Sequence, residues 1–205
     1  MLSIYGWHGS AWFGMGRMSH GTQSTMTMNI GKGGAIRKAG KITPVPAAWK
    51  TLEVDFGEVT KSTVTIPWGD VSTAFYSTGI PNIEVYTAVP ASNVRLMKAS
   101  RYVGWLLASG PVQRYLQNRI PKGGPDTEER AKGRTLMWGE VSDAAGNTFA
   151  ARQFGPEGYQ LTALAALNII EKITSGNFQP GFQTPAKAYG SGLILEIAGT
   201  RRENL

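Results

Sequence analysis

The segment richest in side chains that could bind a ligand runs from Ile66 to Asn82. It turns at Pro67-Trp68-Gly69-Asp70 and continues through a run of serine, threonine and aromatic residues. Loops of this kind place side chains at the mouth of a cleft. Asp70 could accept a hydrogen bond from a substrate, and Tyr76 could donate one. The alternative is structural, with Asp70 as a helix N-cap and Trp68 in the core.

A second candidate is Ser19-His20-Gly21-Thr22, which has the composition of a helix start. Ser19 or Thr22 can cap the helix by accepting a hydrogen bond from a free backbone amide. A helix N-terminus also offers amides and a positive potential to an anionic group. We therefore expect this segment and the segment Trp68–Tyr76 to lie on one side of a cleft.

The patterns that mark common catalytic and metal centres are absent. The chain has no cysteine, and its two histidines, His8 and His20, belong to no metal-ligand motif. Gly14-Met15-Gly16 follows no β-branched strand, and Gly31-Lys32-Gly33-Gly34 lacks the ending of a Walker loop. We therefore expect neither a metal nor a nucleotide cofactor to bind to this chain, and no residue is identified as catalytic.

The net charge of +7 is unevenly distributed along the sequence. Residues 1–52 and 85–125 contain no Asp or Glu, and each of these tracts contains six Lys or Arg residues. Two acid-free basic tracts favour an anionic ligand, an acidic partner surface or nucleic acid, unless the cations are simply scattered over the surface. The aromatic residues are not interleaved with the basic ones as a base-stacking platform requires, which argues against nucleic acid.

The order of elements predicts an α+β fold, with a mixed, mostly antiparallel sheet that is covered on one face by helices. The expected strands are 51–56, 63–66, 83–89, and a β-hairpin of 135–141 and 148–154. The expected helices are 23–30, 92–109, 111–120 and 158–173, of which the third begins at a favoured proline.

Other segments lead to more local expectations. The helix at 158–173 is apolar on most sides and should be deeply packed. Between residues 92 and 109, the candidate buried positions are Val94, Met97, Tyr102, Trp105 and Leu106. We expect residues 35–42 to be a turn-linked segment, residues 122–133 an exposed loop, and residues 193–197 the last strand.

The sequence also suggests a cellular compartment. No apolar run approaches the roughly 20 residues that a membrane span needs. The first residues lack the basic and apolar regions of a signal peptide. The absence of cysteine fits a reducing environment. We therefore expect a cytoplasmic protein.

Four segments together resemble, in the family's order, the C-terminal region of saccharopine dehydrogenase-like proteins, including those called trans-acting enoyl reductases. The segments are Ser19–Thr22, Pro67–Tyr86, Glu157–Thr162 and Gly181–Gly190. The resemblance implies a domain that binds the substrate and forms dimers, next to an N-terminal Rossmann domain that binds NAD(P) in a complete family member. No Gly-x-Gly-x-x-Gly lies between a strand and a helix here, so we expect one domain, residues 1–205, without a nucleotide-binding domain.

Two functions from different classes follow. The first is the substrate-binding and dimerisation domain of an NAD(P)-dependent oxidoreductase, inactive in redox chemistry alone and served by a Rossmann-domain partner in trans. The alternative is a stand-alone, non-catalytic module that binds an anionic ligand or a partner protein. The residues expected to bind a small-molecule substrate are Thr22, Trp68, Asp70, Tyr76 and Tyr189.

We also expect a homodimer. An exposed sheet edge must be paired or covered, which favours an apolar interface built on the sheet. Residues 1–18 show no clean period and are expected to form a packing arm. Its Trp7, Trp12 and Phe13 would pack across the dimer interface or against a neighbouring molecule, because exposed aromatic residues form an adhesive patch.

Overall fold

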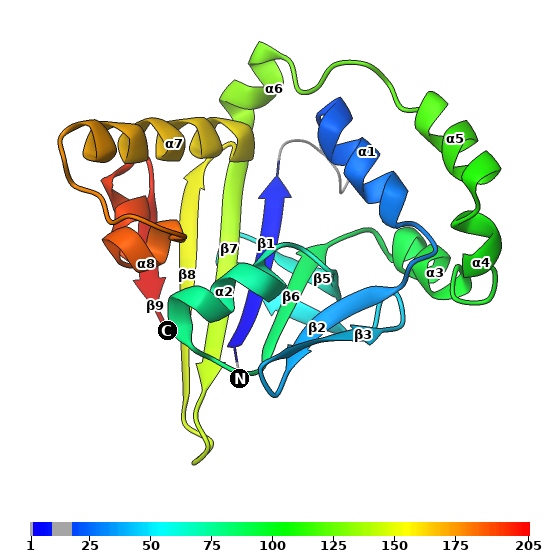
Figure 1. Ribbon diagram of the computed structural model, residues 1–205, viewed down its shortest axis with the longest axis horizontal. Helices are drawn as coiled ribbons and strands as arrows, with labels where there is room; N and C mark the ends of the chain where they lie inside the picture. Colours follow the sequence, from blue (N-terminus) through cyan, green and yellow to red (C-terminus); the bar gives the residue numbers. More distant parts are fainter. Residues whose placement is uncertain (1, 10–17) are drawn as a thin grey trace.

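One sheet organises the chain in the computed structural model, which describes residues 2–9 and 18–205 (Figure 1). Seven of its nine strands follow the path β3-β2-β6-β1-β7-β8-β9, and β5 pairs with β6 and with β4. Strands β1 and β6 run parallel, and the other pairs are antiparallel. The strands are β1 (Leu2–Gly9), β2 (Gly34–Lys38), β3 (Lys41–Val45), β4 (Thr51–Asp55), β5 (Thr60–Thr65), β6 (Ile83–Ala88), β7 (Arg134–Ser142), β8 (Thr148–Pro156) and β9 (Arg201–Asn204).

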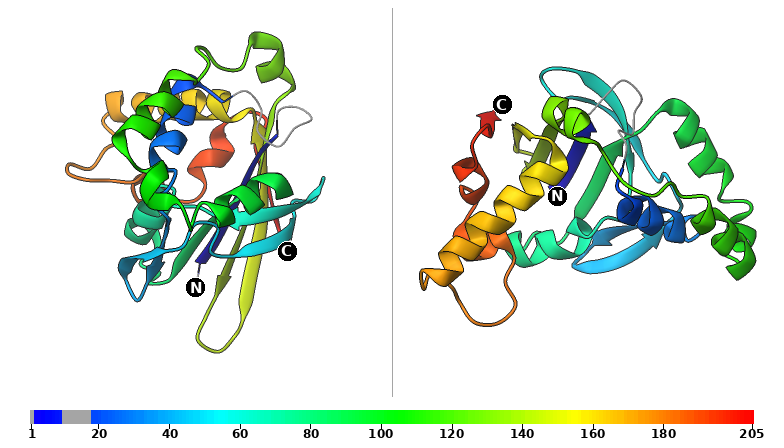
Figure 2. Two further views of the ribbon diagram at one scale, coloured as in Figure 1. Left: turned by 90° about the vertical axis from the view of Figure 1, so that its right-hand side faces the viewer. Right: turned by 90° about the horizontal axis from the view of Figure 1, so that it is seen from above.

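Helices cover one face of this sheet. The right-hand view of Figure 2 shows the molecule from above, with α1, α2, α7 and α8 on one side of the sheet and the β4–β5 hairpin on the other. The helices are α1 (His20–Asn29), α2 (Asp70–Thr78), α3 (Ala91–Ala99), α4 (Gly104–Leu107), α5 (Gly110–Asn118), α6 (Thr127–Lys132), α7 (Gly158–Thr174), α8 (Pro185–Tyr189) and the 3₁₀ helix η1 (Leu193–Glu196). The α+β fold with a mixed, mostly antiparallel sheet is therefore confirmed.

Strand β6 is buried on both faces because a layer lies on each side of it. Ile83 and Val85 join a cluster with residues of α2 and α3, whereas Tyr86 joins a cluster with Phe56 and Leu136. Successive side chains of a strand point to opposite faces, so one strand serves both clusters. The first of these clusters fixes α2, which carries several of the expected site residues, on the helical face.

The expected β7–β8 hairpin and the start of α7 are confirmed, but several other segments differ from the expectation, among them 92–109, which forms two helices, α3 and α4. Residues 35–42 belong to the β2–β3 hairpin, whose turn residues Ala39 and Gly40 both have positive φ, at 48° and 78°. Residues 193–197 contain η1 instead of a strand. The last strand is β9, which was not predicted because its sequence consists of charged and polar residues.

The segment 122–133 is not only a loop, because it contains α6. The Asp126 side chain accepts from the Glu129 amide at 2.8 Å, and the Glu129 side chain accepts from the Asp126 amide at 2.9 Å. This reciprocal capping box stabilises a short helix that lacks an apolar face.

Two expectations of burial are wrong. In α7 the only buried residue is Leu161, whereas Leu167 and Ile170 are 57% and 54% exposed. A helix lying on a single layer buries one stripe and leaves its other sides uncovered. Tyr102 and Trp105, expected in the core, are 85% and 79% exposed.

At the N-terminus, residues 2–9 form β1, an interior strand between β6 and β7, although the sequence indicated no regular element there. The backbone ladders on both sides define this strand without help from a periodic sequence. The expected contacts of Trp12 and Phe13, and of the Trp7 side chain, lie outside the described part of the structure.

Candidate substrate-binding site

The first site segment, Ser19–Thr22, begins α1 as expected. Ser19 is the N-cap, and its Oγ accepts from the Thr22 amide at 3.2 Å. The His20 amide donates to the Gly123 carbonyl at 2.8 Å. The His20 and Thr22 amides, which a helix start could offer to an anionic ligand, therefore already donate hydrogen bonds within the protein. A ligand at this helix start would instead meet the side-chain hydroxyls, each of which can make more than one hydrogen bond.

Those hydroxyls meet the start of α7. The Tyr159 hydroxyl lies 3.0 Å from Thr22 Oγ1 and accepts from the Ser19 amide at 2.7 Å. Thr22 Oγ1 lies 3.0 Å from Ser19 Oγ. Ser19, Thr22 and Tyr159 thus form a hydroxyl cluster that joins two helix N-termini distant in sequence. Hydroxyl groups both donate and accept hydrogen bonds, so the cluster can bind a ligand group that is either a donor or an acceptor.

Glu157 holds Tyr159 in place. It is the N-cap of α7, and its carboxylate accepts from the Tyr159 and Gln160 amides at 2.9 and 3.0 Å. The side chain is buried. Because both bonds satisfy free amides of the first turn, this carboxylate has a capping role and sets the direction of the tyrosine.

A second cluster joins α2 and α8. Ser77 Oγ and Thr184 Oγ1 are 2.6 Å apart, and the ring of Tyr76 meets that of Phe182 edge to face at 5.3 Å. Thr184 is buried and caps α8 by accepting from the Lys187 amide at 3.2 Å. The four segments that carry the family resemblance therefore meet in two pairs. The first pair joins the starts of α1 and α7, and the second joins the end of α2 to the start of α8.

The remaining expected site residues occupy different surroundings. Trp68 is partly buried and packs against the core cluster that contains Ile83 and Val85. Asp70 is exposed in the first turn of α2, where negative charge is favoured, but the N-cap is Gly69. The structure thus groups Tyr76 with Phe182 and Thr22 with Tyr159, in two separate clusters.

Tyr189 connects α8 to the end of α7. Its hydroxyl donates to the Asn177 carbonyl at 2.9 Å, and Lys172 Nζ lies 5.8 Å from its ring centroid. Lys172 also pairs with Glu196 at 2.8 Å. The hydrogen bond from Lys172, and then that from Asn168, lower the pKa of Glu196. These contacts make Tyr189 part of a structural connection at the edge of the second cluster.

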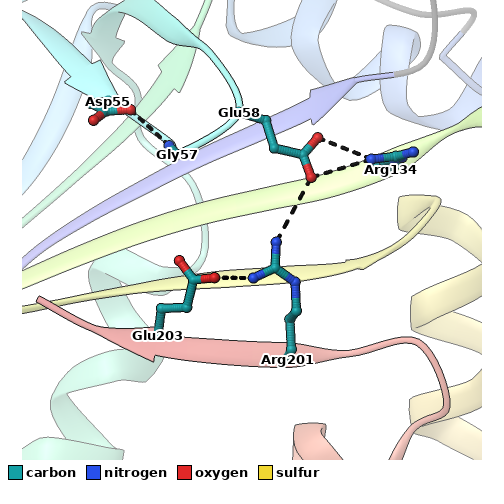
Figure 3. Close-up of polar contacts among 6 residues, drawn as sticks. All are labelled: Asp55, Gly57, Glu58, Arg134, Arg201 and Glu203. Carbon is teal, nitrogen blue, oxygen red and sulfur yellow. Dashed lines mark hydrogen bonds and ion pairs between the residues drawn. The ribbon is translucent and has the colours of Figure 1, made fainter.

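Sequence reasoning missed a pocket of about 270 Å³ on the other side of β7 and β8. Glu58, in the β4–β5 turn, accepts from Arg134 Nη1 at 3.2 and 3.1 Å and lies 3.9 Å from Arg201 (Figure 3). Arg201 also pairs with Glu203 and stacks 3.6 Å above the Phe154 ring. The charged residues that line this pocket are Glu58, Arg134 and Arg201, and all three are paired with one another or with Glu203 beside it.

The described residues lack two further kinds of feature. They contain no group of three or more His, Cys, Asp or Glu side chains placed to hold a metal ion. In the same residues, no helix is long and apolar enough to cross a bilayer.

Comparison with known proteins relates the fold to an oxidoreductase. No family model and no curated protein matches the sequence. A solved structure that it resembles is apo saccharopine dehydrogenase (L-Glu forming) from Saccharomyces cerevisiae, with a TM-score of 0.55 and 10% sequence identity. The match covers 100% of this chain and 66% of that one, so the chain spans less than two thirds of its neighbour. The chain therefore has a dehydrogenase-like fold.

Proposed function

We propose that this chain is the substrate-binding and dimerisation domain of a saccharopine dehydrogenase-like oxidoreductase. The observation that carries the proposal is the pairwise meeting of the four family-like segments, through Thr22 with Tyr159 and through Ser77 with Thr184. Those segments are spread along the chain from residue 19 to residue 190, and the ends of four helices bring them together on the covered face of the sheet.

The two clusters are suited to binding and orienting a substrate. Tyr159 and Tyr76 are 36% and 53% exposed, so both can reach a ligand. Buried Glu157 fixes the backbone of Tyr159, and buried Thr184 bonds to Ser77, the residue after Tyr76. Pre-organised hydrogen-bonding groups align a substrate without a further ordering cost. Hydride transfer requires NAD(P), which a nucleotide-binding domain would hold beside this one, in the same protein or in trans.

Self-association is the second part of the proposal. Leu167, Ile170 and Ile173 form an exposed face of α7, with exposures of 57%, 54% and 45%. Uncovered apolar helix faces are typical of subunit interfaces. Glu171 lies on the same helix, beside Lys172. Charges of both signs at its border allow two copies of this face to pair without net repulsion.

Isothermal titration of the chain with two kinds of ligand tests the proposal. We expect saccharopine to bind with a dissociation constant in the millimolar range or below, and NADH and NADPH to show no measurable binding. Tyr159→Phe should weaken saccharopine binding, whereas Phe149→Ala, an exposed residue on β8, should leave it unchanged. Sub-millimolar binding of either nucleotide, or no binding of saccharopine, would contradict it.

A further inference from the structure

The two acid-free tracts of the sequence fold against each other. Arg101 donates to the Ala47 and Ala48 carbonyls, at 2.8 Å in each case. Ser24 donates to Gln117 at 2.7 Å, which ties α1 to α5. Figure 1 shows α1, β2, β3, α3, α4 and α5 gathered on the right-hand side of the molecule. All six elements belong to residues 1–52 or 85–125.

This gathering separates charge in space. All 14 Asp and Glu residues lie outside the two tracts, which contain 12 of the 21 Lys and Arg residues. Among the described cations of the tracts, Arg37 is buried, and Lys50 pairs with Glu84 at 2.6 Å. The others are exposed, so one side of the protein carries a strong positive potential.

An apolar corner projects from the same side. We use this name for Leu96, Tyr102, Val103, Trp105 and Leu106, at the junction of α3 and α4. Their exposures are 73%, 85%, 43%, 79% and 45%. Burying one such side chain is worth on the order of 2 kcal/mol. A partner that covered the corner would therefore gain a large free energy of binding.

The fold orients this corner outward. Gly31 and Gly104 approach so closely that a Cβ on Gly31 would lie 2.5 Å from the Gly104 carbonyl oxygen. Gln113 donates to the Leu107 carbonyl at 2.8 Å and to the Ile30 carbonyl at 3.3 Å. These contacts dock the inner side of α4 and α5 on the end of α1, so Trp105, which follows Gly104, is held in solvent.

We propose that the apolar corner binds the surface of an anionic phospholipid bilayer. Trp and Tyr prefer the boundary between headgroups and acyl chains, and leucine and valine gain by entering the apolar layer. Arg95, Lys98 and Arg101 are interspersed with the corner residues in sequence and are exposed, so cations border the corner, although Arg101 also donates to the Ala47 and Ala48 carbonyls. The inference goes beyond the proposed function and does not depend on it.

Charge distinguishes this occupant from a second copy of the chain. A two-fold contact places the same patch on both sides, so like charges would face each other across the corner. The aliphatic residues distinguish it from nucleic acid, because leucine and valine gain nothing from stacking on bases. A bilayer satisfies both the apolar side chains and the surrounding cations.

Vesicle co-sedimentation of the full chain tests the proposal. One set of vesicles contains phosphatidylcholine alone, and the other has a third of this lipid replaced by phosphatidylglycerol. We expect binding to the anionic vesicles that weakens as salt is raised, and much less binding to the neutral ones. The double variant Tyr102→Ala/Trp105→Ala should lower the affinity at least about tenfold, because two interfacial anchors are lost. Both residues are exposed, so folding should be preserved, which circular dichroism checks.

Matched variants separate the corner from the rest of the surface. Phe149→Ala removes a side chain that is 70% exposed on the acid-containing half, and it should not change vesicle binding. Lys98→Glu should weaken binding more than Lys187→Glu, which introduces the same charge outside the tracts. Failure to bind anionic vesicles would overturn the proposal, as would equal binding by the double variant. Binding of an oligonucleotide or an acidic protein in place of the vesicles, with the same loss in the double variant, would also overturn it.

Discussion

Tyr159 connects two helix starts through a single hydroxyl group. Its partners, the Ser19 amide and Thr22 Oγ1, belong to α1, whereas its own backbone is fixed by Glu157 at the start of α7. The tyrosine was not among the site residues expected from sequence, although Glu157-Gly158-Tyr159 stands in one of the four resembling segments. An N-cap glutamate before a tyrosine is the signal that could have found it.

Replacing Tyr159 by phenylalanine removes this connection and keeps the ring. We expect the free energy of unfolding to fall by about 0.5–1.5 kcal/mol, the usual net worth of a hydrogen bond. Urea denaturation measures the change. Tyr115→Phe is the matched control, since Tyr115 is 59% exposed and its contact with Arg119 is through the ring. An equal loss in both variants would show that the Tyr159 hydroxyl has no special role.

At the scale of elements, one close backbone approach contributes to docking α4 and α5 on the end of α1. Gly31 has φ of +85°, and both it and Gly104 lack the Cβ that would keep the two segments apart. This approach accounts for the exposure of Trp105, which follows Gly104, whereas Val94 and Met97 pack on the core. Periodicity identifies the residues of one helix face but does not say which face a distant glycine will hold against the fold.

Gly31→Ala should therefore destabilise the protein more than a change of backbone conformation alone. Alanine at positive φ costs on the order of 1–3 kcal/mol, and here a Cβ would also clash with the Gly104 carbonyl. Gly146→Ala isolates the first cost, because Gly146 has φ of +89° and nothing within 4 Å of its Cβ position. Thermal unfolding should show a larger drop for Gly31→Ala, and equal drops would contradict the docking role.

The elements also show what the sequence could predict. Strands β4, β5 and β6 and the β7–β8 hairpin followed from alternation and turn residues, and α5 from its proline. Strands β1 and β9 did not, because neighbouring strands define them through backbone ladders and their sequences show no clean apolar period. The prediction that α7 is deeply packed was wrong for a related reason. A mostly apolar helix predicts contact on all sides, but only one layer lies beneath it.

The candidate site was predictable in part. Ser19 was expected as a possible cap, and Tyr76 was expected on the hydroxyl-rich segment. The pairing of Thr22 with Tyr159 was not, because these residues are 137 positions apart and no local pattern joins them. The pocket beside Glu58 was missed because charged residues from three elements converge there through the sheet.

On the scale of the whole molecule, two exposed apolar surfaces differ in their charged surroundings. The face of α7 lies among charges of both signs, whereas the apolar corner of α3 and α4 is bordered only by cations in sequence. The first surface suits another copy of the chain and the second suits an anionic surface. The two roles can therefore be separated by mutation.

Ile170→Asp tests self-association through α7. Ile170 is 54% exposed, so the substitution should not disturb the core, but it places a charge in an apolar interface. Light scattering should give a mass of twice 22.1 kDa for the unaltered chain and 22.1 kDa for the variant at micromolar concentration. Leu96→Asp, at the apolar corner, should keep the dimer. A monomeric unaltered chain would contradict this part of the proposal.

The central claim is that the four family-like segments bind the substrate together. Amide chemical shifts of the labelled chain, followed by NMR during titration with saccharopine, test it most directly. The proposal predicts shifts at both pairs of segments, around Thr22 and Tyr159 and around Ser77 and Thr184, with little change near Glu58 and Arg134. Chemical-shift changes confined to the pocket beside Glu58 and Arg134, or spread evenly over the whole chain, would contradict it.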